Sequence, residues 1–298
     1  MVWIPAGTFR MGSDRHYPEE APAREVAVKG LWFSRTPVTN AEFSAFVEAT
    51  GYQTVAERPL DAADFPGAPK ANLVPGSMVF VMTPGPVNLR HISQWWRWTP
   101  GASWCRPYGP DSDLEGREDL PVAHVAFEDA VSYADWAGLD LPTEAEWERA
   151  ARGGAEDAAY TWGDDAEQQG ERLANYWHGD FPWRAVKGYG APTPVGSFEP
   201  NGYGLFDMAG NVWEWTTDWY SDRRSDDHPA CCVPHDPRGG SEVGSLDPRQ
   251  PQFRTPRKVI KGGSFLCADS YCRRYRPAAR RPQAVDTGMS HIGFRCCS

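Results

Sequence analysis

Two cysteines lie five positions apart in a segment, 261–276, that is rich in glycine, aromatic residues and arginine. Cys267 and Cys272 alone do not make a zinc knuckle, because such a site needs a second pair of ligands elsewhere. Two thiolates without a cluster of histidines or carboxylates beside them suit a soft ion such as Cu(I), or a thiol redox step. Taken alone, the pair can equally be two cysteines without a shared function.

Basic residues gather around this pair, although the chain as a whole is acidic. One interpretation is that they are solvated or paired inside the protein, and the other is that some hold the cysteine loop or face a substrate peptide. The cluster consists of Arg273, Arg274, Arg276, Arg280 and Arg281.

Composition limits the classes of protein to which the chain can belong. Its 298 residues can form one large domain or two small ones, and nothing marks a boundary. The 29 glycines, 27 prolines and 14 tryptophans indicate much irregular structure, with indole rings supplying buried area. A net charge of -10 argues against a nucleic-acid partner. No stretch reaches the roughly 18 apolar residues of a membrane span. No signal peptide is visible, and the seven cysteines then favour the cytoplasm.

Local signals predict three helices and several short strands. Two capping boxes, 39–42 and 143–146, predict helices that end at Gly51 and Gly153. Apolar residues at helical spacing predict a third helix over 128–136. Short apolar runs predict strands over 2–4, 8–11, 25–28, 258–261 and 292–296.

The stretch between Pro59 and Asp119 is rich in proline, glycine and tryptophan and has no clear period. Its tryptophans would be costly to leave in water, so we interpret it as an ordered insertion. They are Trp95, Trp96, Trp98 and Trp104.

Several phrases of this sequence together resemble the sulfatase-modifying-factor family, over essentially the whole chain, 1–298. They are PAGTFRMG (5–12), PVTN (37–40), LPTEAEWE (141–148), ANYW (174–177), PNGYG (200–204), GNVWEW (210–215), KGGS (261–264) and GFRC (293–296). The cysteine pair, framed by Gly-Gly-Ser and Tyr-Cys-x-Arg-Tyr-Arg, narrows the resemblance to the formylglycine-generating enzymes. The resemblance implies a single α+β domain with little regular secondary structure and a C-type-lectin-like core.

The resemblance also implies an activity. Members oxidise a cysteine in a Cys-x-Pro-x-Arg motif of a not-yet-folded sulfatase to Cα-formylglycine, with O2 as oxidant and an added reductant. Their cofactor is Cu(I) held by two cysteines, which here are Cys267 and Cys272. Thiolates are the ligands that Cu(I) prefers, and a substrate thiolate would be a third soft ligand.

Four further residues match the family's active site. Ser264 matches a serine near the oxygen and substrate pocket, although its hydroxyl could simply bond backbone. Tyr271 and Trp213 match pocket aromatics, although each could be core packing. His291 stands where better-known members carry Asn, and this exchange changes geometry and titration.

A calcium site is implied at the GNVWEW phrase. Its ligands would be Asp207, Glu214 and the backbone carbonyls of Gly210 and Val212, and hard oxygen donors on a tight turn suit this ion. The competing interpretation is that Glu214 pairs with an arginine.

A second calcium site of the family would use Asn175 and the carbonyls of Tyr176 and Tyr189. In an ungapped count Lys187 takes the place of an aspartate ligand there, and a cation opposes another cation. The alternative is that Asp180 or a shift in register supplies the missing carboxylate.

The resemblance leaves the other cysteines without assigned chemistry. Of the disulfides of animal members, Cys296 matches one half, but Ala134 stands at its partner position. The second pair maps to Ala151 and Pro277, so neither bond can form here. Cys231, Cys232 and Cys297 match no functional position.

Two other functions use this fold. A non-catalytic, lectin-like ligand-binding module would have been favoured by loss of either cysteine of the pair, but both are present. An iron-dependent sulfoxide synthase would need a His-x-x-x-His-x-Glu string, which the sequence lacks. An O2-dependent, copper-containing protein-cysteine oxidase is therefore the main prediction.

Overall fold

The computed structural model describes residues 1–298 except 64–66, 68, 70–72, 156, 167–170 and 223–231. The described part contains few helices and several small sheets. The α-helices are α1 (Asn40–Thr50), α2 (Phe127–Ala137) and α3 (Glu144–Arg152). The strands are β1 (Val2–Ile4), β2 (Gly7–Met11), β3 (Arg24–Val28), β4 (Leu31–Phe33), β5 (Gly76–Phe80), β6 (Trp96–Pro100), β7 (Gly179–Asp180), β8 (Arg184–Ala185), β9 (Trp213–Trp219), β10 (Arg257–Lys261), β11 (Arg281–Ala284) and β12 (Ile292–Gly293).

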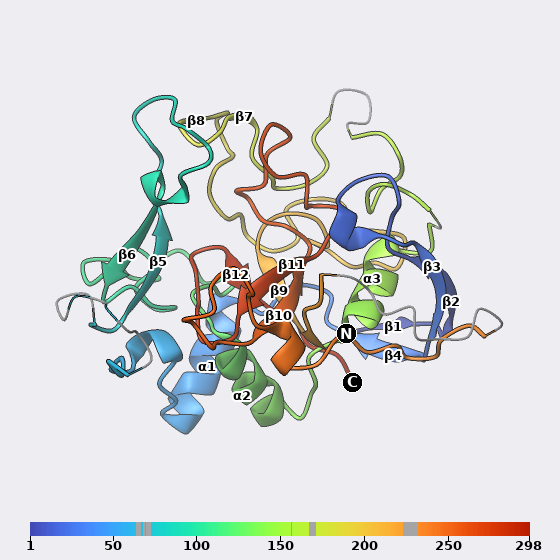
Figure 1. The fold of residues 1–298 in the computed structure, drawn as a ribbon, viewed down its shortest axis with the longest axis horizontal. Helices are drawn as coiled ribbons and strands as arrows, with labels where there is room; N and C mark the ends of the chain where they lie inside the picture. The colour runs from blue at the N-terminus through green and yellow to red at the C-terminus, as the bar shows by residue number, and fades with distance from the viewer. Residues whose placement is uncertain (64–66, 68, 70–72, 156, 167–170, 223–231) are drawn as a thin grey trace.

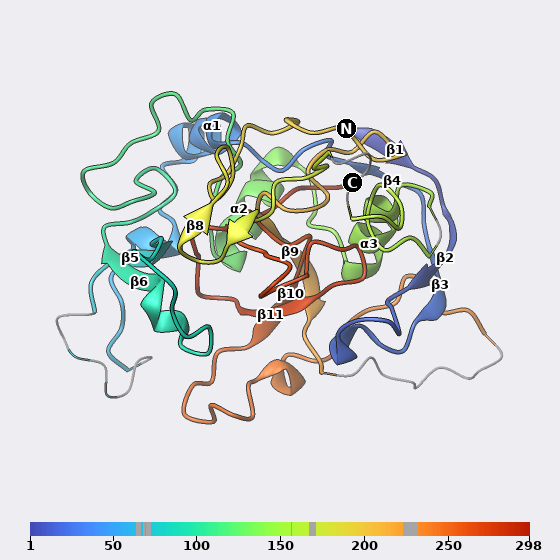
Figure 2. The same ribbon diagram turned by 90° about the horizontal axis from the view of Figure 1, so that it is seen from above.

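The largest sheet has the order β11-β10-β9-β12, with β12 parallel to β9 and the other neighbours antiparallel. Figure 1 shows α1 and α2 beneath this sheet, with the hairpins β5–β6 and β2–β3 on opposite sides of it. The view from above keeps these hairpins at opposite ends (Figure 2). Long loops between the sheets carry most of the chain, as the glycine and proline content predicts.

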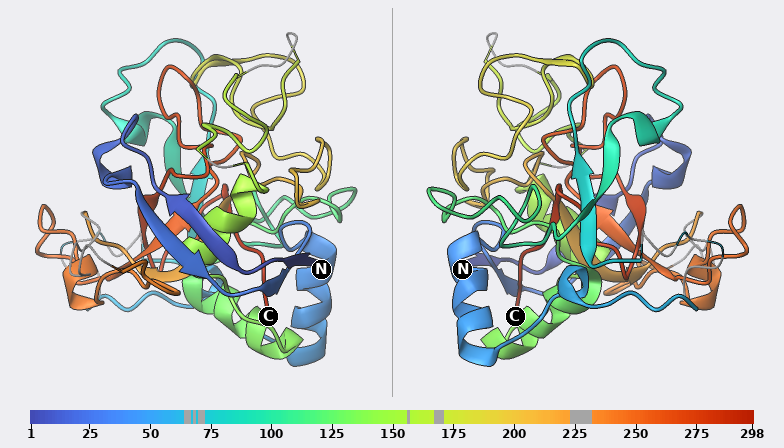
Figure 3. Two further views of the ribbon diagram at one scale, coloured as in Figure 1. Left: turned by 90° about the vertical axis from the view of Figure 1, so that its right-hand side faces the viewer. Right: turned by 90° about the vertical axis from the view of Figure 1, so that its left-hand side faces the viewer.

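The two chain ends meet beside the small β1–β4 sheet. Trp32 and Ser298 exchange backbone hydrogen bonds of 2.9 Å in both directions. Cys297 continues this contact, because its N–H donates to the carbonyl of Asp140 at 2.8 Å. Figure 3 shows both ends on the side of the molecule that carries α1 and α2. Cys297, to which no function was assigned, is thus a buried residue of the core beneath β1 and β4.

The predicted helices are confirmed, and their ends have the expected chemistry. Thr39 and Thr143 each accept a hydrogen bond from the N–H three residues later, and the glutamate there bonds back. α2 begins at Phe127, one residue before the prediction, because Asp129 accepts the N–H of Ala126 at 2.8 Å. Gly51 ends α1 in the left-handed region, with φ of 70°.

The strand predictions were right in four of five places and too long in the fifth. Residues 294–296, predicted as strand, instead accept single hydrogen bonds from the loop 34–38, for example from Val38 N–H to the Phe294 carbonyl at 2.9 Å. The central strand β9 was not predicted at all. Its residues are buried on both faces, so the alternation that identifies a half-buried strand is absent.

The tryptophan-rich stretch is ordered where the structure describes it, as predicted. Trp95 and Trp104 are buried, whereas Trp96 and Trp98 are partly exposed on β6. Trp95 packs with Phe181 and Trp177 in a cluster beside the cysteine loop. No helix in the described residues is long and apolar enough to cross a membrane.

Candidate active site

The cysteine pair lies in the loop between β10 and β11. The two Sγ atoms are 3.4 Å apart, and both side chains are buried. The loop turns tightly, because the N–H of Cys267 donates to the Ser264 carbonyl at 2.9 Å and that of Cys272 to Ala268 at 2.6 Å. The prediction that the two cysteines form one site is therefore consistent with their geometry.

Gly263 allows the chain to close on itself at this point. Its φ is 73°, and a Cβ atom there would lie 2.8 Å from the Cα of Tyr275 and from the carbonyl oxygen of Arg274. Only glycine accepts both the left-handed conformation and this close approach. The Gly-Gly-Ser phrase thus brings the start of the loop against its end.

The two thiols do not have equal acidity. The hydrogen bond from Cys267 is the main reason that the pKa of Cys272 lies below the ordinary range of a thiol, and the charges of Arg281 and Arg274 add to it. Burial raises the pKa of Cys267. The pair therefore favours one thiolate at Cys272 that accepts a hydrogen bond from the Cys267 thiol. A thiolate is the metal-binding and nucleophilic form.

The N-terminal segment holds the loop through ion pairs. Arg274 Nη2 lies 2.6 Å from Glu19 Oε1, and its Nη1 lies 3.9 Å from the Cys272 sulfur. Arg276 makes a buried, two-pronged ion pair with Glu20. The interpretation that arginines hold the loop is confirmed for these two, but sequence reasoning missed their glutamate partners, because over 250 residues separate them.

The remaining arginines of the cluster differ in their surroundings. Arg280 is buried against Glu144 with a distance of 2.9 Å, and Arg273 makes an exposed ion pair with Asp269. Both therefore fit the interpretation of internal or solvated pairing. Arg281, on β11, is partly exposed and contributes positive charge to both cysteines.

The structure places the four other predicted site residues around the loop. Trp213 is buried in the same hydrophobic cluster as both cysteines. Tyr271, 37% exposed, stacks on Phe181 with 4.7 Å between ring centroids. Ser264 is fully buried, and its Oγ accepts the N–H of Leu266 at 3.3 Å, which is the backbone role considered as its alternative.

His291 lies against β6, with its ring 4.7 Å from that of Trp96. Its carbonyl accepts the N–H of Trp213 at 2.8 Å, and its Nδ1 is buried without a hydrogen-bond partner. Burial is the main cause that holds its pKa well below the ordinary value, so the ring is neutral. The backbone of His291 thus links it to Trp213, and its side chain retains an unused polar atom.

Known proteins resemble this chain over its full length. The family model described as Sulfatase-modifying factor enzyme 1-like domain matches residues 1–298. The formylglycine-generating enzyme of Mycobacterium tuberculosis is 53% identical over 300 residues, covering 99% of this chain and 96% of its own. That of Thermomonospora curvata is 45% identical, covering 100% and 93%.

The chain belongs to the sulfatase-modifying-factor family.

The same comparisons confirm that this family member is an enzyme of the formylglycine-generating, oxidase type. The fold prediction is also confirmed. PvdO from Pseudomonas aeruginosa, at 24% identity, has the same fold with a TM-score of 0.62, covering 99% of this chain and 92% of its own. Few helices, small mixed sheets and a lectin-like arrangement are shared features of such structures.

The GNVWEW turn of this family member holds the carboxylate of Glu214, which accepts three hydrogen bonds. Arg295 donates from Nη2 to Glu214 Oε1 and from Nε to Oε2, each at 2.7 Å, and Trp147 donates to Oε2 at 2.6 Å. The alternative that Glu214 pairs with an arginine is therefore what the structure shows. A carboxylate accepts about four hydrogen bonds, so three donors leave little capacity for a cation.

Asp207 lies close to this pair, at a backbone φ of 55°. Its carboxylate accepts the N–H of Gly196 at 2.8 Å, and burial raises its pKa. Gly210 and Val212 lie between Asp207 and Glu214 in the sequence, directly before β9. The calcium itself stays a prediction.

The second predicted calcium site has one suggestive atom. Asn175 is buried, and its side-chain oxygen has no hydrogen-bond partner, while its amide nitrogen donates to the Ala191 carbonyl at 2.9 Å. Tyr176 is the next residue in the sequence. The ring of His178 contacts both predicted neighbours, with its centroid 4.0 Å from that of Tyr176 and 4.3 Å from that of Tyr189. An unpartnered buried carbonyl oxygen is what a cation site would leave in a structure without ions.

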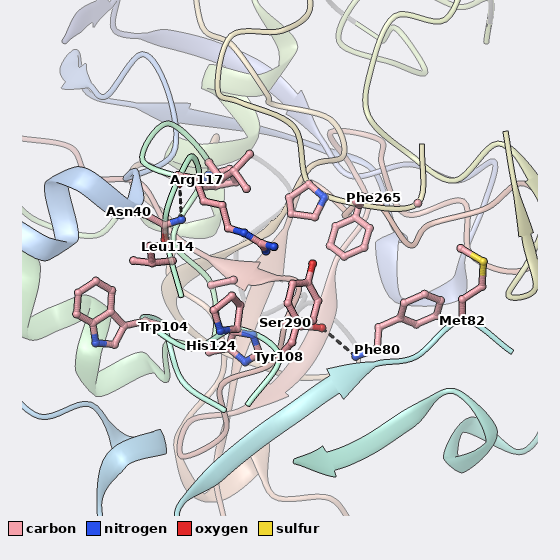
Figure 4. A pocket seen from close by; sticks show the side chains of 17 residues that line it. Asn40, Phe80, Met82, Trp104, Tyr108, Leu114, Arg117, His124, Phe265 and Ser290 are labelled. Atoms are coloured by element: carbon pink, nitrogen blue, oxygen red, sulfur yellow. Dashed lines mark hydrogen bonds between the residues drawn. The ribbon is translucent and has the colours of Figure 1, made fainter. Parts of the chain in front are cut away.

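A cavity of about 210 Å³ adjoins the site without including the cysteines. Its wall contains Phe265, which follows Ser264, and Ser290, which precedes His291. Figure 4 shows Arg117 pointing into the space between Phe265 and Trp104. Sequence reasoning missed this cavity, because its residues come from widely separated stretches of the chain.

No group of three or more histidine, cysteine, aspartate or glutamate side chains could hold a metal among the described residues. Cys105, Cys267, Cys272, Cys296 and Cys297 form no disulfide, and Cys231 lies outside the described residues. The two sulfur atoms 3.4 Å apart are of the donor type that suits a soft ion, and the copper itself stays a prediction.

Proposed function

We propose that this protein converts the cysteine of a Cys-x-Pro-x-Arg motif in a sulfatase polypeptide to Cα-formylglycine, using O2 and an external reductant. The observation that carries the proposal is the buried pair of thiols 3.4 Å apart in a full-length relative of formylglycine-generating enzymes. Membership of the family gives the class of reaction, and the thiol pair gives the place where it can occur.

The residues present fit Cu(I) as the cofactor. Cys267 and Cys272 supply two soft sulfur donors, and the depressed pKa of Cys272 makes one of them a thiolate without help from a metal. Hard oxygen ligands do not compete, since the carboxylate of the loop, Asp269, is bonded to Tyr275 and Arg273. When bound, Cu(I) would supply the redox chemistry that activates O2 beside the substrate thiolate.

The protein's own part in the reaction is to position the substrate and to exclude water. Trp213 and the aromatic residues around Trp95 close the site with apolar surface. Tyr271, partly exposed and stacked on Phe181, forms the part of this wall that a substrate can reach. The neutral His291 ring can accept or donate one hydrogen bond at its free Nδ1.

Calcium is a second proposed ligand of the fold, with a structural role. Asn175 offers an unpartnered oxygen, and the carbonyls of Tyr176 and Tyr189 would complete the set. At the GNVWEW turn, Arg295 already neutralises Glu214, so calcium there would have to share this carboxylate or displace the guanidinium.

The substrate should be an extended segment of a chain that has not yet folded, because the target cysteine of a folded sulfatase lies in its own active site. Proline in the motif limits backbone freedom and so lowers the ordering cost on binding. The excess of carboxylates, with a net charge of -10, suits an arginine-containing peptide better than nucleic acid. We place the reaction in the cytoplasm, where thiols such as those of Cys267 and Cys272 persist.

Mass spectrometry of a motif peptide tests the proposal. The peptide is incubated with enzyme, Cu(I), a thiol reductant and air, and conversion of its cysteine to an aldehyde is the expected result. Peptides with Arg→Ala or Pro→Ala in the motif should lose kcat/KM. A peptide that binds but is recovered unchanged under all metal conditions would show a non-catalytic binding module instead.

A further inference from the structure

Four aromatic rings form a continuous stack beside the cysteine loop. Trp162 and Tyr160 lie 5.1 Å apart and nearly parallel at 3°, and Tyr160 and Tyr275 lie 5.8 Å apart at 15°. Tyr275 and Tyr176 are closest, with centroids 4.0 Å apart and planes at 9°. Tyrosine and tryptophan are the side chains that lose a single electron most readily after the thiols, and stacking brings their π-systems into contact.

This stack connects the interior with the surface. Tyr275 is fully buried, follows Cys272 by three residues and shares a hydrophobic cluster with both cysteines. Tyr160 is nearly buried, whereas Trp162 is partly exposed at the outer end. A molecule that cannot reach the thiols directly can therefore touch the end of the stack.

Tyr275 also has a partner for its proton. Its phenolic O–H donates a short hydrogen bond to Asp269 Oδ1, and Asp269 lies between the two cysteines in the sequence. A phenol loses an electron far more easily when its proton can move to a base at the same time. The Asp269 side chain is 52% exposed, so water reaches the carboxylate that accepts this hydrogen bond.

The proposed reaction requires electrons from outside. One substrate thiol and one O2, together with two electrons and two protons, give one aldehyde, one hydrogen sulfide and one water. Two molecules of a thiol reductant supply both electrons and both protons by forming a disulfide. The buried cysteine pair, at 2% and 7% exposure, leaves no room for such a reductant while a peptide covers the site.

We propose that Trp162, Tyr160 and Tyr275 relay single electrons from a thiol reductant at the surface to the cysteine site, with Asp269 holding the phenolic proton of Tyr275. In each step Tyr275 gives one electron to the oxidised site and its proton to Asp269. The resulting tyrosyl radical takes an electron through Tyr160 and Trp162, and the proton returns. The relay rests on the proposed function, because it delivers the two electrons that this reaction consumes.

Tyr133 provides a matched control inside the same protein. It is 8% exposed and belongs to the same hydrophobic cluster, and its ring stacks on Phe43. The ring of the exposed Trp136 lies 5.7 Å away but is tilted by 56°, so Tyr133 has a neighbouring tryptophan without the stacked geometry of Tyr275 and Tyr160. No hydrogen bond of its hydroxyl is seen in the described residues, so it also lacks a proton acceptor. If the stack around Tyr275 were only packing, the two tyrosines would behave alike towards oxidants.

The first experiment uses the metal-free protein, so it does not depend on turnover. A ruthenium tris(bipyridine) sensitiser with persulfate oxidises exposed residues in a flash, and freeze-quenched samples are examined by EPR for tyrosyl radical. We expect a signal that Tyr275→Phe removes in large part, that Tyr160→Phe weakens and that Tyr133→Phe leaves intact. Tyr160→Phe keeps the ring and leaves the Tyr275–Asp269 bond untouched, so its effect cannot come from an altered loop.

Any one of three outcomes overturns the relay. The wild-type protein gives no tyrosyl signal, the signal persists in Tyr275→Phe, or Tyr133→Phe loses as much signal as Tyr275→Phe. A second measurement separates this from failure of the proposed function. In peptide turnover, Tyr160→Phe should lower kcat with an unchanged KM for the peptide, and the Cys267 and Cys272 thiols should oxidise faster. If the wild type makes no aldehyde but the radical pattern holds, the relay stands and the proposed reaction is wrong.

Discussion

The Glu214 carboxylate and the Cys272 thiolate are two buried anions that each lie beside an arginine guanidinium. They differ in how closely the guanidinium approaches and in how many hydrogen bonds the anion accepts. Arg295 meets Glu214 with two hydrogen bonds of 2.7 Å, and Trp147 adds a third. Arg274 approaches the Cys272 sulfur only to 3.9 Å, because its stronger partner is Glu19 at 2.6 Å. The carboxylate is neutralised and the thiolate is not.

The difference separates a structural anion from a reactive one. A carboxylate bonded on three sides can do little except hold β9 against α3 and the loop before Cys296. A thiolate whose partners are one thiol and a distant cation keeps lone pairs for a metal or a substrate. Saturation of hydrogen bonds, rather than burial, thus distinguishes the two regions.

The largest effect is expected from removing the reactive anion. Cys272→Ser should abolish turnover and tight binding of Cu(I), because a hydroxyl is a poor soft ligand and is not ionised at neutral pH. Activity on a motif peptide and copper content after gel filtration measure both losses.

Cys297→Ser is the control for this change. Cys297 is as buried as Cys272, at 5% against 7%, but it packs in the core beneath β1. Its variant should keep copper and activity even if its stability falls. Full activity of Cys272→Ser would contradict the assignment of the thiol pair.

The next largest effect is expected from removing the guanidinium that pairs with Glu214. Arg295→Met leaves Glu214 charged, buried and short of two donors, and breaking such a pair typically costs about 3–5 kcal/mol. Urea unfolding should show this loss. Arg249→Met, at an exposed pair with Asp247, is expected to change stability by no more than about 0.5 kcal/mol. Similar losses in both variants would mean that Glu214 does not depend on Arg295.

Sequence could predict the elements whose signals are local. The capping boxes at Thr39 and Thr143 and the glycine stops located the helices within a residue, because the groups that bond lie within one turn. The cysteine pair could be predicted for the same reason, since one short loop carries both thiols. β9 could not, because a strand buried on both faces has no alternation to detect.

The supports of the site were beyond sequence reasoning. Glu19 and Glu20 reach the cysteine loop from the other end of the chain, and their side chains look like any acidic surface pair. The stack around Tyr275 likewise combines residues from distant parts of the sequence. The ion pairs and the aromatic stack both depend on tertiary packing, which determines the residues that come into contact among several possible ones.

Calcium gives an effect of intermediate size. If calcium binds at Asn175, the ion should stabilise the fold by mass action, by about 2.7 kcal/mol at a hundredfold excess over Kd. A chelator should then lower the Tm of the wild type but not that of Asn175→Leu, which lacks the free side-chain oxygen. Metal analysis accompanies the melts. Protein that retains no calcium after incubation with an excess of the ion, and whose Tm calcium does not raise, has no such site.

The smallest expected effect tests how weakly the reactive anion is held. Arg274→Met removes one of two cations that lower the pKa of Cys272, so this pKa should rise. A lowered pKa keeps the anion present at lower pH, so the variant should lose its thiolate absorbance at a higher pH than the wild type. We expect a shift of about one pKa unit, equivalent to about 1.4 kcal/mol. Arg274→Lys keeps the charge and should recover most of the shift. A titration unchanged in Arg274→Met would show that Arg274 does not stabilise the thiolate, and would leave the hydrogen bond from Cys267 and the charge of Arg281 as the causes of its low pKa.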